Sequence, residues 1–238
     1  YVVVTTSSGG FVGIVDYETG ESLYSRNNAY DGNLHATELL PDGNLVVAGS
    51  TGNSVTVFAS SQGDGDGYYK KYAFEDAHGL LWDPDLEVLW ALGGSQLTAY
   101  KLTGTQAMPE LEQQAELTFD LPTSGGHDLY PVYGQENKFW VTTVSGLYQF
   151  DTDTGSFAAY DEDGANGINV RDIKSIGNQP YSDTIVRAVA DVGNDYAIWC
   201  TDTIELFIPQ GNGAWQLVRK TVASDDYYKD RVWQYKYQ

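Results

Sequence analysis

The three histidines of the chain recur at one position of a repeated pattern, and this repeat constrains the fold more than any other feature. His35, His78 and His127 are separated by 43 and 49 residues. Each begins a short apolar segment, which leads through a turn rich in Pro, Asp or Gly into an alternating apolar run. A period of this length with four strand-like segments is typical of a β-propeller blade.

Four strand-like segments can be recognised in each unit that a histidine begins. They are HATELL, NLVVAGS, SVTVFAS and YYKKYAF in the first unit, and HGLLW, VLWALGG, LTAYKL and AELTFDL in the second. The third unit holds HDLYPV, KFWVTTV, GLYQFDT and SFAAYDE. Their alternation with period two and their β-branched and aromatic residues predict antiparallel strands. We interpret residues 108–117, MPELEQQAEL, as a loop leading into an outer strand, although they are also compatible with a helix.

A fourth unit without a histidine, at 170–222, and two complementary chain ends complete the pattern. The start of the chain supplies three strand-like segments and its end supplies one, so pairing of the two ends would leave no open sheet edge. We predict an all-β fold, a five-bladed β-propeller of four-stranded antiparallel blades closed by pairing of the N- and C-terminal strands. A two-domain sandwich is the competing fold. The predicted single domain, 1–238, has its blades at 1–34 plus 224–238, 35–77, 78–126, 127–169 and 170–223.

The charge of the chain excludes several classes of partner. Its formal net charge is −20, from 33 acidic and 13 basic residues, and such a field repels nucleic acid and anionic membrane surfaces. No apolar run approaches the roughly 18 residues of a membrane span, and no signal peptide is visible. The one cysteine, Cys200, lies in an apolar run and excludes an internal disulfide. The many Tyr, Trp, Gly and Thr residues resemble those of secreted microbial β-proteins, so we expect an extracellular monomer.

The recurring histidines are the first candidates for a functional site. In a propeller the first strand of each blade lines the central channel, so equivalent positions converge at one face. Converging neutral imidazoles are good ligands for a divalent metal ion. We therefore expect His35, His78 and His127 to form one site that could hold Mn, Zn or Ca, without an organic cofactor. Separate packing of each histidine at the head of its strand is the alternative.

Basic residues occupy the corresponding positions of the other two blades. The fourth unit offers Arg171, Asp172 and Lys174, and the C-terminal segment offers Lys229 and Arg231. Cations beside histidines suit an anionic ligand such as the carboxylate of a uronate. We predict that Lys174, Arg231 and Arg171 bind substrate, with ordinary surface charge as the alternative. The register of the fourth unit leaves open which of its residues faces the channel.

Aromatic residues near these segments supply further candidates. Trp82 could stack on the face of a sugar and contribute to substrate binding. Tyr130 could act as an acid, and we group it with His127 and His78 as catalytic candidates. Core packing between blades is the alternative for each aromatic residue.

The acidic stretch DTDTGSF, residues 151–157, superficially resembles a calcium-binding loop. The glycine required at the sixth position of such a loop is Ser156 here. The same D-x-x-T-G sequence recurs at 16–20, so we interpret both stretches as hairpin turns between strands.

The phrases HGLLWDP, LWALG and LTAY, followed by GGHDLYPV, FWVTT and GLYQFD, resemble a family of uncharacterised secreted propeller proteins of bacteria and fungi. The resemblance covers roughly residues 30–208 and implies the propeller fold and secretion, without an agreed activity. The three-histidine channel is also remotely similar to that of oligogalacturonate lyases, which are larger propellers. That similarity implies a metal held by histidines and one further polar ligand, for which Asp172 is the candidate here.

Together these features lead us to expect a carbohydrate-active protein with one asymmetric central site. The leading hypothesis is a lyase that acts on an acidic, uronate-containing glycan. The alternatives are a non-catalytic, lectin-like glycan-binding propeller and a protein-interaction scaffold. Lectin propellers usually carry one site in each of several near-identical blades, whereas the blades of this chain differ strongly.

Overall fold

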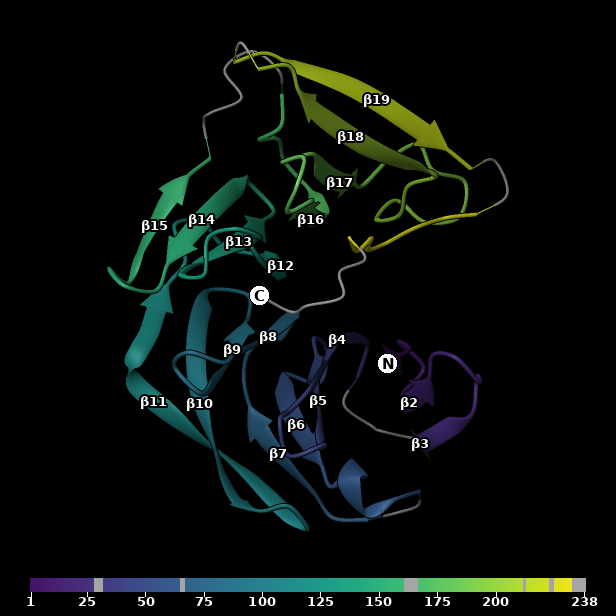
Figure 1. Ribbon diagram of the computed structural model, residues 1–238, viewed down its shortest axis with the longest axis vertical. Coiled ribbons are helices and arrows are strands. Elements are labelled where there is room, and N and C mark those ends of the chain that lie inside the picture. Colours follow the sequence, from purple (N-terminus) through teal and green to yellow (C-terminus); the bar gives the residue numbers. More distant parts are fainter. Residues whose placement is uncertain (28–31, 65–66, 161–166, 212, 223–224, 233–238) are drawn as a thin grey trace. The chain divides into compact units, whose positions relative to one another are not determined.

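The computed structural model describes the chain except for residues 28–31, 65–66, 161–166, 212, 223–224 and 233–238. Its strands form five antiparallel sheets, distributed over two compact units (Figure 1). The units are Tyr1–Asp120 and Leu121–Gln238. Within the described ranges, the one helical segment is the 3₁₀ turn η1 (Ser60–Gln62), and no helix is long and apolar enough to cross a membrane.

The N-terminal unit contains three of the sheets. The first is built from β1 (Val2–Thr6), β2 (Val12–Asp16) and β3 (Ser22–Arg26). The second is built from β4 (Leu34–Leu39), β5 (Leu45–Gly49), β6 (Ser54–Phe58) and β7 (Tyr69–Ala73). The third is built from β8 (Gly79–Asp83), β9 (Val88–Leu92), β10 (Gln96–Thr105) and β11 (Met108–Asp120). Strand β4 contacts both β1 and β8, so the first strands of neighbouring sheets lie side by side.

The C-terminal unit contains the other two sheets. One is built from β12 (Gly126–Pro131), β13 (Lys138–Thr143), β14 (Leu147–Asp151) and β15 (Ser156–Ala159). The other is built from β16 (Ile173–Asn178), β17 (Ile185–Val189), β18 (Thr203–Pro209) and β19 (Trp215–Thr221). Here too the first strands, β12 and β16, contact each other.

This architecture is a five-bladed β-propeller, as the repeat predicts, with three strands in the first described sheet and four in each of the others. Of the C-terminal segment predicted to pair with the first sheet, residues 225–232 carry a bridge between Tyr227 and Thr201. The remainder, 233–238, lies outside the described residues.

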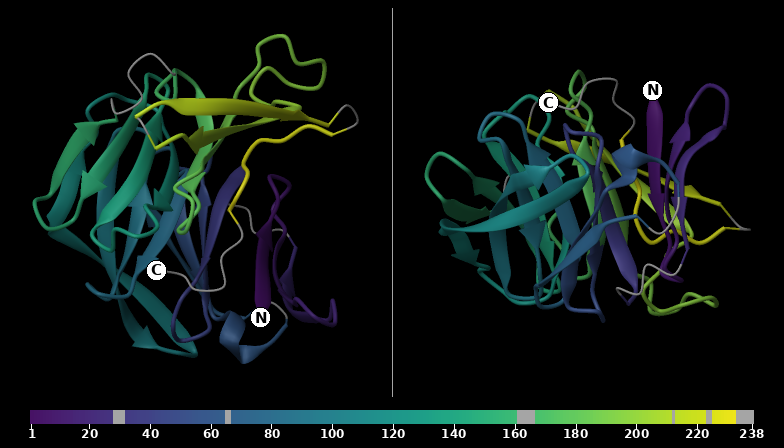
Figure 2. Two further views of the ribbon diagram at one scale, coloured as in Figure 1. Left: turned by 45° about the horizontal axis from the view of Figure 1, so that its top comes forward. Right: turned by 90° about the horizontal axis from the view of Figure 1, so that it is seen from below.

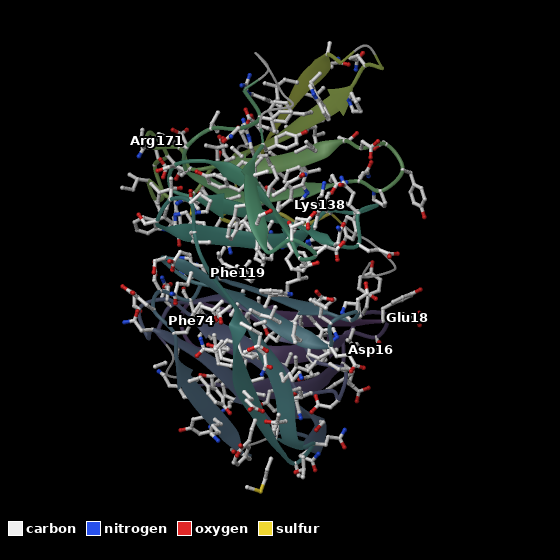
Figure 3. All side chains as sticks on the ribbon, turned by 90° about the vertical axis from the view of Figure 1, so that its left-hand side faces the viewer. Asp16, Glu18, Phe74, Phe119, Lys138 and Arg171 are labelled. Carbon is white, nitrogen blue, oxygen red and sulfur yellow. The ribbon has the colours of Figure 1, made fainter. Side chains whose placement is uncertain are left out.

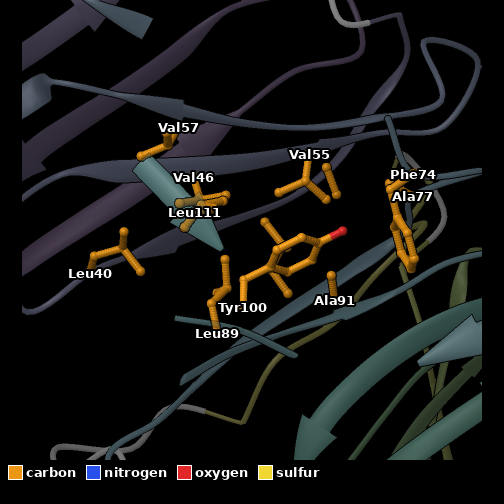
Figure 4. Close-up of a cluster of buried hydrophobic side chains, with 12 residues drawn as sticks. Leu40, Val46, Val55, Val57, Phe74, Ala77, Leu89, Ala91, Tyr100 and Leu111 are labelled. Carbon is orange, nitrogen blue, oxygen red and sulfur yellow. The ribbon is translucent and has the colours of Figure 1, made fainter. Parts of the chain in front are cut away.

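Neighbouring sheets within a unit pack through apolar side chains. The middle strands β5, β6 and β9 are buried on both faces, whereas the outer strand β7 is largely exposed. Figure 4 shows the resulting core of the second and third sheets, where aliphatic side chains surround Tyr100. A second core joins the two sheets of the C-terminal unit and includes Trp140, Ile176 and Phe207. Burial of this apolar surface is the main force that holds the sheets together.

The prediction that residues 108–117 form a loop is wrong. They belong to β11, which is the longest strand in the described part of the chain. Strand β11 pairs with β10 from Met108, opposite Thr105, to Asp120, opposite Gln96, and residues 115–117 of β11 bulge out opposite the step from Thr98 to Ala99. Buried Leu111 joins the core, and its N–H donates to the Tyr72 hydroxyl at 2.7 Å. Cross-strand pairing and this packing outweigh the local helix propensity.

The two D-x-x-T-G sequences are hairpin turns, as predicted. The Asp16 carboxylate accepts hydrogen bonds from the Thr19 N–H at 2.8 Å and hydroxyl at 2.9 Å. The Asp151 carboxylate accepts the same pair of bonds from Thr154. These bonds favour the ionised form, and they lower the pKa of both carboxyl groups.

Candidate functional site

Three site residues occupy the same unusual position of their strands. In β4, β12 and β16 the pairing register slips by one residue near the strand start, so His35, His127 and Lys174 are the extra residues of β-bulges. The fourth, His78, directly precedes β8, and its N–H donates to the Leu92 carbonyl at 2.8 Å. A bulge redirects its side chain relative to the regular pleat and is common beside functional sites.

A backbone turn precedes each of these residues by two positions. The residues at this position have left-handed φ angles, and they are Asn33 (53°), Asp76 (50°), Gly125 (79°) and Asp172 (59°). Few side chains tolerate this conformation, and Gly, Asn and Asp do so at the least cost. Lys174 is therefore the fourth blade's equivalent of the three histidines, which answers the register question left open by the sequence.

The N-terminal unit brings two of the histidines into contact. The ring centroids of His35 and His78 lie 4.1 Å apart, with 32° between the ring planes. Nδ1 of His78 donates to the Asp76 carbonyl at 2.8 Å, and Nε2 of His35 accepts from the Asn33 amide at 2.8 Å. The residues of the two left-handed turns thus orient the imidazoles.

The C-terminal unit brings the third histidine together with two lysines. Nζ of Lys174 lies 2.8 Å from His127 Nε2, within hydrogen-bond distance. Nζ of Lys229 donates to the His127 carbonyl oxygen at 2.6 Å. Lys174 is buried and Lys229 is largely so. Lysines are almost never buried unless they are paired, so this arrangement needs a compensating charge.

Asp128, the residue after His127, supplies that charge and was not among the predicted site residues. Its fully buried carboxylate accepts two hydrogen bonds from the Arg231 guanidinium, at 2.7 and 3.1 Å, and lies 3.3 Å from Lys229 Nζ. The same carboxylate accepts the N–H of Ile176 at 3.1 Å. Asp128 thus connects β12, β16 and the C-terminal segment. We call Lys174, Lys229 and Arg231, together with His127 and Asp128, the cationic cluster.

Burial changes the proton affinities in the cationic cluster. It lowers the pKa of Lys229 to about 8, although the Asp128 carboxylate opposes this change. It also lowers the pKa of Lys174, and here the negative charge of Asp172 opposes the change. Both lysines therefore lose their protons more readily than an exposed lysine, which is a property of basic groups in active sites.

The other predicted site residues lie in different surroundings. Tyr130 is buried; its hydroxyl lies within hydrogen-bond distance of the Val232 carbonyl oxygen, and the Arg231 guanidinium covers its ring at 4.8 Å. Burial raises the pKa of Tyr130. Arg171 is exposed (Figure 3), and Trp82 packs partly buried against the core of the N-terminal unit.

The metal site expected from His35, His78 and His127 stays a prediction, because the first two belong to one unit and the third to the other. Among the residues that the structure describes, no group of three or more His, Cys, Asp or Glu side chains is arranged to hold a metal ion. To bind a metal ion through Nε2, His127 would have to use the same nitrogen that contacts Lys174.

Comparison with known proteins places the chain in a family but not in a functional class. Residues 1–217 match the family of unknown function DUF6528, and the chain belongs to this family. A comparison with curated proteins finds no match.

Solved structures of similar fold include a proposed 6-phosphogluconolactonase from Bacteroides uniformis, with a TM-score of 0.60 and 13% sequence identity over 93% of this chain and 67% of that one. Virginiamycin B lyase from Staphylococcus aureus aligns with a TM-score of 0.54 and 12% identity, over 93% and 69% of the two chains. The β-propeller domain of Cps50 (Swd1) from Myceliophthora thermophila gives 0.54 and 14%, over 92% and 67%. At these identities the likeness concerns the fold alone.

Proposed function

We propose that the protein is an extracellular, monomeric, carbohydrate-active propeller, a lyase that cleaves an acidic, uronate-containing glycan at the cationic cluster. The observation that carries this proposal is the convergence of Lys174, Lys229 and Arg231 around His127. Three of only 13 basic residues meet there, in a chain with a net charge of −20. Such a local reversal of sign favours an anionic ligand that the rest of the surface repels.

The chemistry of a uronate suits these groups. Its carboxylate would lie against Lys229 and Arg231, and their positive charges would stabilise the negative charge that develops when the neighbouring carbon loses its proton. A neutral Lys174, in contact with His127, would accept that proton. The electron pair of the broken C–H bond forms a carbon–carbon double bond, and the bond from the next carbon to the glycosidic oxygen breaks. The leaving sugar's oxygen then takes a proton from water or from a protonated group of the site.

Lys174 is a better candidate for the base than Tyr130, which the sequence suggested as a catalytic residue. Burial lowers the pKa of Lys174 and so favours its neutral amine, whereas burial raises the pKa of Tyr130. His127 would hold the Lys174 amine in position. A divalent ion held by the histidines is the alternative means of neutralising the carboxylate.

A panel of polyuronates tests this proposal through the absorbance of the unsaturated products, with and without a chelator. We expect absorbance to rise with at least one polyuronate and to be unaffected by the chelator, while neutral polysaccharides give no change. Activity that the chelator abolishes would instead support the metal on the histidines. Unchanged absorbance across the panel would contradict the lyase, and binding without products would support the glycan-binding alternative. Failure to bind any glycan would favour the remaining alternative, a protein-interaction scaffold.

Affinity for a polyuronate should depend on the proton of Lys229. Only the protonated lysine attracts a carboxylate, so affinity should fall by roughly tenfold as the pH rises through about 8. Calorimetric titrations across this range measure the change, in a Lys174→Arg background that prevents turnover and keeps a fixed charge. The matched control is an additional Lys229→Arg substitution, because a guanidinium stays protonated and should flatten the profile. Equal pH dependence with and without that substitution would contradict the role of Lys229.

A further inference from the structure

The loop between β17 and β18 presents an unusual set of apolar side chains to solvent. In residues 191–199, which we call the aromatic loop, Val192 is 82% exposed, Tyr196 77%, Ile198 60% and Trp199 57%. The loop projects from its sheet (Figure 2). Single exposed apolar residues are ordinary, but four large ones within nine residues of one loop make this loop a candidate binding surface.

Hydrogen bonds inside the aromatic loop hold it in this conformation. The Asn194 side-chain oxygen accepts the N–H groups of Tyr196 at 2.8 Å and Ala197 at 2.9 Å. The Asp191 carboxylate accepts the Gly193 N–H at 2.8 Å, and the Asp191 N–H donates to the Cys200 carbonyl at 2.9 Å, which closes the base of the loop. A loop that is ordered before it binds loses less conformational entropy on binding.

Both ends of the aromatic loop are attached beside the lysines of the cationic cluster. At its start the Ala190 N–H donates to the carbonyl of Asp172, two residues before Lys174. After its end Thr201 forms a two-bonded bridge with Tyr227, two residues before Lys229. Two residues of extended chain span only about 7 Å. The two ends of the loop therefore lie near the cationic cluster within the same unit.

We propose that the aromatic loop is a saccharide subsite, which binds the sugar next to the uronate held by the cationic cluster. This inference rests on the proposed function. Sugar rings present C–H groups that pack on the electron-rich faces of Trp199 and Tyr196. The carboxylate of Asp195, next to Tyr196 in the sequence, can accept hydrogen bonds from sugar hydroxyls. Such a mixture of aromatic faces and polar acceptors fits a glycan.

Binding measurements with a uronic acid monomer and a series of oligouronates test the subsite. Trp199→Ala and Tyr196→Ala should each lower the affinity for oligomers by roughly threefold to tenfold and leave the affinity for the monomer unchanged. The matched control is Tyr181→Ala, which removes an aromatic ring that is 96% exposed but lies in the turn before β17, at the other end of that strand. This control should bind every length as the unsubstituted protein does. The three side-chain truncations can be compared at equal thermal stability, because the rings are exposed.

The outcomes separate this inference from the proposed function. Length-dependent binding that requires Trp199 supports the subsite even when no unsaturated product forms, a result that would refute only the lyase. Oligomer affinity that is unchanged in both loop variants overturns the subsite, whether or not the protein is a lyase. Self-association in light scattering that Trp199→Ala abolishes overturns it as well, because the loop would then bind a second copy of the chain.

Discussion

Asp128→Ala should lower the free energy of unfolding by about 3–5 kcal/mol, one of the largest effects of any single substitution in this protein. The substitution leaves the Lys229 and Arg231 charges next to each other without their shared carboxylate. It also removes the acceptor of the buried Ile176 N–H. An unpaired buried N–H and two uncompensated cations are each costly, so the losses should combine at this position. Urea denaturation followed by tryptophan fluorescence measures the change.

Two further variants show whether charge is the cause. Asp153→Ala removes an exposed carboxylate of the same unit and should change the free energy of unfolding by no more than about 0.5 kcal/mol. Combining Asp128→Asn with Lys229→Met and Arg231→Met replaces the charged group with neutral side chains of similar size and should recover part of the lost stability. A cost for Asp128→Ala no greater than that of Asp153→Ala would contradict the role of the carboxylate.

The recurrence of the histidines at one position of the repeat was sufficient to predict the fold, and the structure places each histidine at the start of the first strand of its sheet. In all three blades a residue with a left-handed φ precedes the histidine by two positions. His35 and His127 are then the extra residues of bulges in β4 and β12, whereas His78 directly precedes the regular strand β8. Because His35 and His78 occupy equivalent positions in neighbouring sheets, their rings are in contact. The same position of the repeat, applied to the fourth blade, selects Lys174 once the bulge in β16 is known.

Asp128 could not be recognised from the sequence in the same way. It is one of 33 acidic residues, and its partner Arg231 lies 103 positions further along the chain. No local pattern distinguishes a buried carboxylate from a solvated one, because its burial depends on packing between β12, β16 and the C-terminal segment. The signal that could have indicated it is its place directly after His127, in a segment otherwise apolar. For residues 108–117 the error had a similar origin, since pairing with β10 decides their conformation.

Lys174→Met should lower kcat on a polyuronate by about 10²–10⁴-fold, which is the usual contribution of a general base. The matched variant Lys174→Arg keeps a positive charge near His127, but a guanidinium stays protonated and cannot accept the proton. We therefore expect Lys174→Arg to bind the polyuronate with nearly unchanged affinity and still to lose kcat. The initial rate of product absorbance and a calorimetric titration measure the two quantities separately.

The pH dependence of the unsubstituted protein provides a test that a merely structural lysine would not pass. The base must be neutral, so kcat/KM should rise with pH as Lys174 loses its proton, and burial brings this rise to a lower pH than for an ordinary lysine. Substrate binding needs a protonated Lys229, whose pKa burial lowers to about 8, so the same quantity should fall at alkaline pH. The two opposing dependences give a bell-shaped profile. Lys229→Arg should remove the alkaline fall and keep the rise. A Lys174→Arg protein that turns over within about threefold of the unsubstituted rate would show that the base is another group.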